Sequence, residues 1–146
     1  IRQWNRLLST AVCTKELKMG NGSTCRSYQI TNYICPLQAF VTEHSMTTSP
    51  ELIEEYLQTL PVHDGESEPR YNLFAWNDPA RGFTVVYLPR EKHRPACYTA
   101  TGKGQLLVSP GALDMAGLLV TPRKEDFDKI TEQDILQIYN EVAYHN

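Results

Sequence analysis

Residues 71–123 decide the fold, and they read YNLFAWNDPARGFTVVYLPREKHRPACYTATGKGQLLVSPGALDMAGLLVTPR. Short apolar runs alternate here with proline, glycine, asparagine and aspartate, which is the pattern of strands separated by turns. The runs predict four strands, at residues 71–76, 83–88, 105–108 and 118–121. The first two are joined by Asn77-Asp78-Pro79-Ala80-Arg81-Gly82, a connection slightly longer than the two-residue ideal of a hairpin. We therefore expect these strands to share an antiparallel sheet.

The segments before this stretch predict further strands. Residues 24–34 are rich in Tyr, Ile and Thr, and residues 37–42 resume the strand pattern after Pro36. Because proline cannot donate a hydrogen bond to a sheet, Pro36 indicates an edge strand or a bulge at this point. The pair Asn21-Gly22 marks a tight turn ahead of both segments.

Three segments carry helix signals. Ser49 as N-cap and Pro50 at the first helical position predict a helix that ends before Pro61. Thr131 and Asp134 form a capping-box variant at the start of a terminal helix. The apolar stripes at helical spacing are Trp4, Leu7, Leu8 and Ala11; Leu52, Ile53, Tyr56, Leu57 and Leu60; and Ile135, Ile138, Tyr139 and Val142. The chain is therefore predicted to be α+β, with an antiparallel sheet backed by helices.

Composition places the chain among globular proteins of one domain. Its 146 residues are 41% hydrophobic and 21% charged, with a formal net charge of −3 and a pI near 5.8. This balance argues against a general nucleic-acid binder, and no apolar run approaches the roughly 18 residues of a membrane span. The four cysteines contain no C-x-x-C pair, so we interpret them as free thiols in the reducing cytoplasm. We expect a single domain over residues 1–146, and because the chain opens with Ile1, the C-terminal part of a longer protein.

The order of motifs in the second half resembles a known family. Tyr71-Asn72-Leu73 is followed by a strand ending in Leu88-Pro89-Arg90, and then by VSPGALDMAGLLV at residues 108–120. In this order they resemble the C-terminal domain of ATP adenylyltransferases and diadenosine tetraphosphate phosphorylases. Those proteins belong to the histidine-triad (HIT-like) superfamily, together with galactose-1-phosphate uridylyltransferases and GDP-hexose phosphorylases. More closely, the loop at residues 89–95 and the Ser109-Pro110 pair that follows the third run resemble a branch of the superfamily found in Bacteroides-type bacteria.

This resemblance implies a nucleotide phosphorylase or nucleotidyltransferase-like protein that acts on phosphoanhydrides of nucleotides. Its fold would be HIT-like, and its nucleophile would be a histidine in a histidine–x–histidine pattern on the half that precedes this domain. The histidines of this chain, His44, His63, His93 and His145, are isolated, so no catalytic residue is predicted within it. The chain alone is accordingly expected to be inactive.

The resemblance also implies the partners. They are a nucleotide or sugar nucleotide and the protein's own N-terminal half, with no nucleic acid and no membrane, while self-association stays open. No metal and no cofactor are expected. The alternative interpretation is a non-catalytic module that kept the fold for nucleotide binding or for assembly. A histidine–x–histidine strand upstream would favour the enzyme, and its absence would favour the module.

The candidate binding site is the cationic loop at the end of the second strand. It contains Arg90, Lys92, His93 and Arg94, which place three permanent cations and one imidazole within five residues. Guanidinium groups bind phosphate oxygens in a bidentate manner, and lysine supplies a point charge, so these residues are predicted to bind phosphate. The simpler interpretation is a solvated loop in which Glu91 pairs with a neighbour.

Two further residues are predicted to support this loop. Asp114 lies between Leu113 and Met115, and an acid in so apolar a setting needs partners. It could cap the turn at Ala116-Gly117 or orient a cation of the loop. Ser109, with the following Pro110-Gly111, could present backbone N–H groups to an anion, although such turns are common without a ligand.

One acidic segment stands apart from the rest. Residues 51–68 contain six Asp or Glu side chains and no Lys or Arg. A solvated helix face and loop are the simpler interpretation, and an acidic docking surface is the alternative.

Overall fold

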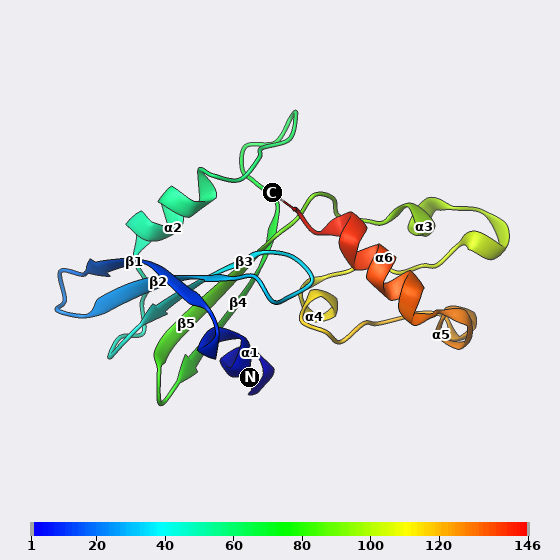
Figure 1. Cartoon of the computed structure of the whole chain (residues 1–146). Helices are drawn as coiled ribbons and strands as arrows, with labels where there is room; N and C mark the ends of the chain where they lie inside the picture. The colour runs from blue at the N-terminus through cyan, green and yellow to red at the C-terminus, as the bar shows by residue number, and fades with distance from the viewer. Residues whose placement is uncertain (1, 146) are drawn as a thin grey trace.

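The computed structural model describes residues 2–145, and its centre is a five-stranded antiparallel sheet (Figure 1). The strands follow the order β1-β2-β3-β5-β4. Their bounds are β1 Val12–Lys18, β2 Thr24–Ile30, β3 Leu37–Thr42, β4 Tyr71–Asp78 and β5 Gly82–Pro89. The β4–β5 hairpin pairs Asp78 with Gly82 and leaves three residues in its loop. The predicted α+β class with an antiparallel sheet is confirmed.

Helices cover both faces of the sheet. On one face, α1 (Arg2–Ser9) and the end of α6 (Glu132–Val142) bury Trp4, Tyr139 and Val142 against strand residues such as Leu88. On the other face, α2 (Pro50–Leu57) packs Leu52 against Phe40, Val85 and Tyr87. The predicted caps are present, since Ser49 Oγ accepts from Leu52 N at 3.2 Å and Thr131 Oγ1 accepts from Asp134 N at 3.2 Å.

β3 occupies the middle of the sheet, so the expectation of an edge strand after Pro36 was wrong. Pro36 lies just before Leu37, the first residue of β3, and takes no place in either ladder. A proline at that position removes no hydrogen bond from the sheet, so it is compatible with a central strand. The strand itself is almost completely buried, because β2 and β5 flank it and helices cover both its faces.

The C-terminal part of the chain forms a smaller lobe beside the sheet (Figure 1). It contains α3 (Ala96–Thr99), the 3-10 turn η1 (Gly102–Gly104), α4 (Ala112–Met115) and α5 (Lys124–Lys129), and it packs against α6. Leu106, Val108 and Ile138 form its buried centre. Within residues 2–145, no helix is long and apolar enough to span a bilayer.

The strands predicted at residues 105–108 and 118–121 are absent from the sheet, and both predictions were wrong. Their backbone groups have other partners. Leu107 N donates to Asp126 Oδ2 at 2.9 Å, and Val120 N donates to Asp114 Oδ1 at 2.6 Å. Buried carboxylates thus satisfy donors that a neighbouring strand would otherwise satisfy. The two segments run through the lobe as irregular chain, and within the first of them Val108 N donates to Leu106 O at 2.8 Å, which closes a tight turn.

Candidate functional site

Arg90 is buried at the junction of the sheet and the C-terminal lobe, although it was predicted to face a ligand. Its side chain is only 4% exposed. The guanidinium donates to Val142 O at 3.2 Å, Asn72 Oδ1 at 2.6 Å, Pro110 O at 2.9 Å, Lys92 O at 2.9 Å and His93 O at 3.1 Å. An arginine has five N–H donors, and here each has an acceptor. Arg90 therefore has no donor left for a phosphate, and it positions the loop instead.

The surroundings of Arg90 explain how a cation is tolerated inside the protein. Burial lowers the pKa of the Arg90 guanidinium, and the nearby Cys35 and Asp114 act in the opposite direction. Four backbone carbonyls and one amide oxygen supply the negative ends of dipoles to the guanidinium. Its main chain also forms a bridge with Ala143, so the start of the loop is fixed at both backbone and side chain.

The other three loop residues, Lys92, His93 and Arg94, are exposed. They differ in whether their charges have partners within the protein. Lys92 Nζ donates to Glu141 Oε1 at 2.8 Å, so its charge is already paired. His93 lines a hollow that also contains Glu66, Glu68 and Arg70. Arg70 pairs with Glu66, so Glu68 is the acid without an ion pair beside His93 among the described residues. Arg94 lies with its guanidinium carbon 4.4 Å from the centre of the Tyr98 ring. Among residues 2–145, no carboxylate lies within ion-pair distance of Arg94.

Arg94 lies near the start of a segment that is free of acidic residues. From residue 92 to residue 113 the chain has Lys92, His93, Arg94 and Lys103 and no Asp or Glu. Lys103 lies in the exposed turn η1, and Figure 1 shows this part of the chain, with α3, extending away from the sheet. We call residues 92–104 the basic arm. It combines a stacked arginine with a lysine at its tip, which suits the recognition of a polyanion.

The two supporting residues do not contact a cationic side chain. Asp114 is buried, and its carboxylate accepts from Gly111 N at 2.8 Å and Val120 N at 2.6 Å. The Asp114 carboxylate therefore satisfies backbone N–H groups on either side of the turn at Ala116-Gly117. It forms no side-chain hydrogen bond with a cation of the loop. Ser109 is exposed. The turn that Ser109 opens does reach the loop, because the carbonyl of Pro110 accepts from Arg90.

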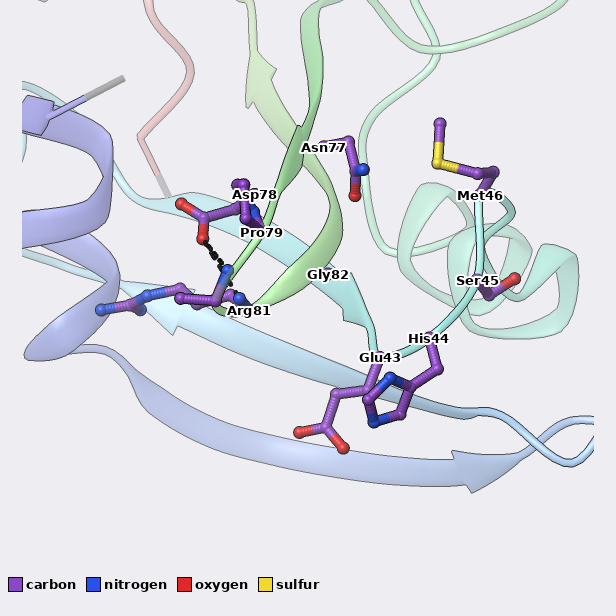
Figure 2. Close-up of a pocket in the computed structure, with 10 residues that line it drawn as sticks. Glu43, His44, Ser45, Met46, Asn77, Asp78, Pro79, Arg81 and Gly82 are labelled. Carbon is purple, nitrogen blue, oxygen red and sulfur yellow. Dashed lines mark hydrogen bonds between the residues drawn. The ribbon is translucent and has the colours of Figure 1, made fainter.

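A polar cleft of about 590 Å³ lies where β3 ends beside the β4–β5 turn, and Figure 2 shows its lining. His44 is the only non-glycine residue among residues 2–145 with a positive φ, at 55°. Asp78 accepts from Asn5, Ala80 and Arg81, and these hydrogen bonds lower the pKa of its carboxyl. In Figure 2 the Arg81 side chain points toward α1 and away from His44, consistent with its hydrogen bond to Asn5 O. The second acid of the cleft, Glu43, pairs with Arg26, so both acids and the arginine already have partners within the protein.

Sequence reasoning missed this cleft and its glycine. Gly82 has φ 104°, and a Cβ at this position would lie 2.2 Å from Thr42 O. The Asn77–Gly82 connection was recognised as a hairpin turn, but nothing in it indicates that it would lie beside residues 43–46. Within residues 2–145, no histidine hydrogen-bonds to another histidine, and no three His, Cys, Asp or Glu side chains are grouped as metal ligands.

One family model matches the chain. It is described as "GDPGP1-like, C-terminal domain", and it covers residues 10–146. No curated protein and no solved structure matches the chain. The match does not confirm the resemblance to the HIT-like superfamily or to ATP adenylyltransferases. Because it spans more than half of the sequence, the chain belongs to the GDPGP1-like C-terminal domain family.

Proposed function

We propose that this chain is the C-terminal domain of a nucleotide phosphorylase or nucleotidyltransferase-like protein. The observation that supports this proposal most is the family match over residues 10–146. The substrate would be a nucleotide or sugar nucleotide with a phosphoanhydride. A histidine outside this chain would attack phosphorus and form a nucleotidyl–histidine bond, while the phosphoanhydride oxygen leaves with the distal phosphate. A phosphate acceptor would then take the nucleotidyl group and release the histidine.

In this proposal the domain contributes binding groups. The basic arm offers Arg94, which no carboxylate of the described residues neutralises, and Lys103 at its tip. Stacking on Tyr98 restrains the Arg94 side chain, so less rotamer entropy is lost when its guanidinium binds phosphate oxygens. Arg90 fixes the base of the arm through its five hydrogen bonds. Lys92 would take part only if its ion pair with Glu141 opens.

The second candidate is a non-catalytic nucleotide-binding or assembly module. It is favoured by the isolation of the histidines, because a nucleophilic histidine needs a group that orients it. The enzyme and a nucleotide-binding module both require the basic arm to contact phosphate, whereas an assembly module does not. The two candidates differ in whether the longer natural protein transfers a nucleotidyl group.

Phosphate recognition is tested first on the 146-residue chain. Calorimetric titration with a nucleoside triphosphate should show weak binding that weakens further with added salt, because charge dominates it. Changing Arg94 to Ala should lower the affinity about tenfold or more, since a charged hydrogen bond contributes about 1.5–3 kcal/mol. The control is Lys124→Ala, which removes an exposed cation of α5. Equal affinities for Arg94→Ala and the wild type would contradict the proposed role of the arm.

Catalysis is tested on the longest natural form that contains this chain. Phosphorolysis of sugar nucleotides and dinucleoside polyphosphates, followed by chromatography, should show turnover that the 146-residue chain lacks. Arg94→Ala in the long form should reduce kcat/KM by a similar factor to its effect on binding. Absence of turnover together with retained nucleotide binding would favour the non-catalytic module.

A further inference from the structure

A groove of about 630 Å³ runs along α2. Figure 1 shows α2 at the end of the molecule away from α4 and α5. Ile53 and Leu57 line its helix wall, and Val62 and Pro69 line the opposite wall, in the segment between α2 and β4. The helix residues share one face because they are four positions apart. Val62 is 52% exposed, which is high for a valine, and its side chain lies against this groove. We call this feature the α2 groove.

The segment that forms the second wall is held in place. Arg70 Nε donates to both carboxylate oxygens of Glu66, at 2.9 and 3.0 Å, and Arg70 Nη1 donates to Glu91 O at 2.7 Å. The backbone turns at His63–Glu66, where Glu66 N donates to His63 O at 3.0 Å and Gly65 adopts φ 81°. The hydrogen bonds from Arg70 to Glu66 connect this turn to the residue that precedes β4. The groove therefore exists before anything binds, and a partner would not have to order the loop first.

The charge around the groove has one sign. Glu54 and Glu68 line it, and from residue 44 to residue 69 the chain has six acidic side chains and no Lys or Arg. Two of the six have cationic partners, Glu55 with Lys15 and Glu66 with Arg70. Among residues 2–145 the others, Glu51, Glu54, Asp64 and Glu68, form no ion pair. Apolar walls are thus combined with carboxylates that lack counter-charges.

We propose that the α2 groove docks a polypeptide segment that presents apolar side chains flanked by Lys or Arg. The apolar walls require apolar side chains, because only these gain from leaving water there. The unpaired carboxylates select basic flanks, and they repel nucleic acid, anionic membranes and acidic segments. Helix and groove together provide the geometry by which amphipathic helices are recognised. The second wall of the groove adjoins the base of the basic arm, because Glu68 also lines the hollow that contains His93. The proposal does not depend on the nucleotide chemistry.

The test uses three synthetic peptides of equal length on the 146-residue chain. The first is an amphipathic helix with leucine at i, i+3, i+4 and i+7 and lysine elsewhere, the second has glutamate in place of lysine, and the third has serine in place of leucine. Fluorescence anisotropy should show saturable binding of the first alone. Glu68→Lys should weaken that binding about three- to tenfold, since the reversal removes one exposed charge pair and adds a repulsion. Val62→Ser should weaken it also, and because Val62 is half-exposed the fold should tolerate the change.

The matched control is Glu125→Lys, an equal charge reversal at an exposed position on α5. It should leave the affinity unchanged. Equal effects of Glu68→Lys and Glu125→Lys, or tight binding of the serine peptide, would mean that general charge attraction explains the result, and would overturn the proposal. Sedimentation velocity tests whether a second copy of the chain occupies the groove instead. Self-association that Val62→Ser abolishes would assign the groove to a second copy of the chain and would overturn the proposed partner.

Discussion

At the scale of the single residue, Arg90 shows how a buried charge can be stabilised without a carboxylate that hydrogen-bonds to it. Moving a guanidinium out of water is costly unless its donors are all satisfied. Here five neutral oxygens accept its hydrogen bonds, and none of them belongs to a carboxylate. The acceptors come from β4, the basic arm, the turn at Pro110 and the end of α6. Arg90 therefore joins segments that are far apart in the sequence.

Replacing Arg90 should destabilise the protein strongly. Arg90→Ala leaves several buried acceptors without a donor, and we expect a loss of at least about 3 kcal/mol in the free energy of unfolding. Arg90→Lys should recover less than half of it, because an ammonium has three donors on a compact centre and cannot reach all the acceptors. Urea denaturation is the measurement. The control Arg94→Ala, at an exposed position, should change stability by less than about 0.5 kcal/mol. A lysine variant as stable as the wild type would contradict this account.

The cationic loop could be found from the sequence, but its geometry could not. Four basic or titratable residues within five positions are visible by inspection. Which of them turns inward depends on where Pro110 and Val142 lie in the fold, and no local pattern gives that position. The prediction that Lys92, His93 and Arg94 bind phosphate stays a prediction, and the role given to Arg90 changes from binding to positioning.

At the scale of the elements, local signals were reliable where burial alternates or a cap is present. β2 and β4 were predicted and do alternate in burial, α2 and α6 carry their caps, and β3 and β5 were predicted as short apolar runs that are almost continuously buried. β1 was missed because six of its seven residues are exposed and its sequence, VCTKELK, has no apolar face. Conversely, residues 106–108 are apolar, yet they pair with no strand, since Asp126 and the Cys97 carbonyl accept hydrogen bonds from Leu107 N and Leu106 N. An apolar run in the sequence predicts that a segment is buried. Whether the segment is a strand depends on whether a neighbouring strand accepts and donates its backbone hydrogen bonds.

This difference predicts unequal costs for two similar truncations. Val86 is fully buried in β5 and faces the cluster under α1 and α6, so Val86→Ala should cost about 2–4 kcal/mol. Leu119 lies in the irregular segment and is half-buried, so Leu119→Ala should cost about 1 kcal/mol. The midpoints of urea unfolding measure both. Equal losses would mean that the lobe packs as tightly as the sheet.

At the scale of the whole molecule, the sheet and the C-terminal lobe differ in what stabilises them. The sheet has buried clusters on both faces, whereas the lobe has a small cluster around Leu106, Val108 and Ile138. The lobe relies in addition on Asp126, which is fully buried and accepts hydrogen bonds from Arg123, Leu107 N and Lys129. α6 contacts both parts, because Tyr139 packs on the sheet and Ile138 packs on the lobe. We therefore expect the lobe to be the more sensitive part to acid.

The pKa of Asp126 gives the direction of this sensitivity. The hydrogen bond from Arg123, supported by Leu107 N and Lys129, holds the pKa of this carboxyl below its usual value. A depressed folded-state pKa means that the stabilisation is complete above the unfolded value of about 3.9 and is lost as pH falls below it. Asp126→Asn should lower the urea midpoint at neutral pH, and the difference from wild type should shrink in acid. NMR hydrogen exchange should show the Leu107 amide losing protection before the β3 amides.

The control for this prediction is Asp128→Asn. Asp128 lies on the same helix and pairs with Lys124 in an exposed position, so its removal should have little effect. Equal changes in the two variants at neutral pH, or simultaneous loss of protection in lobe and sheet as pH falls, would show that Asp126 does not hold the lobe.

The hydrogen bonds of Arg90 also have a consequence during synthesis of the chain. A polypeptide emerges from the ribosome from its N-terminus, and domains begin to fold as they appear. When Arg90 emerges, Asn72 is the only one of its side-chain acceptors already made, and Val142 emerges more than fifty residues later. Until then the guanidinium must stay hydrated, so the junction between sheet and lobe has to remain open to water. A nascent chain can form its sheet early, but this junction closes only when the end of α6 arrives.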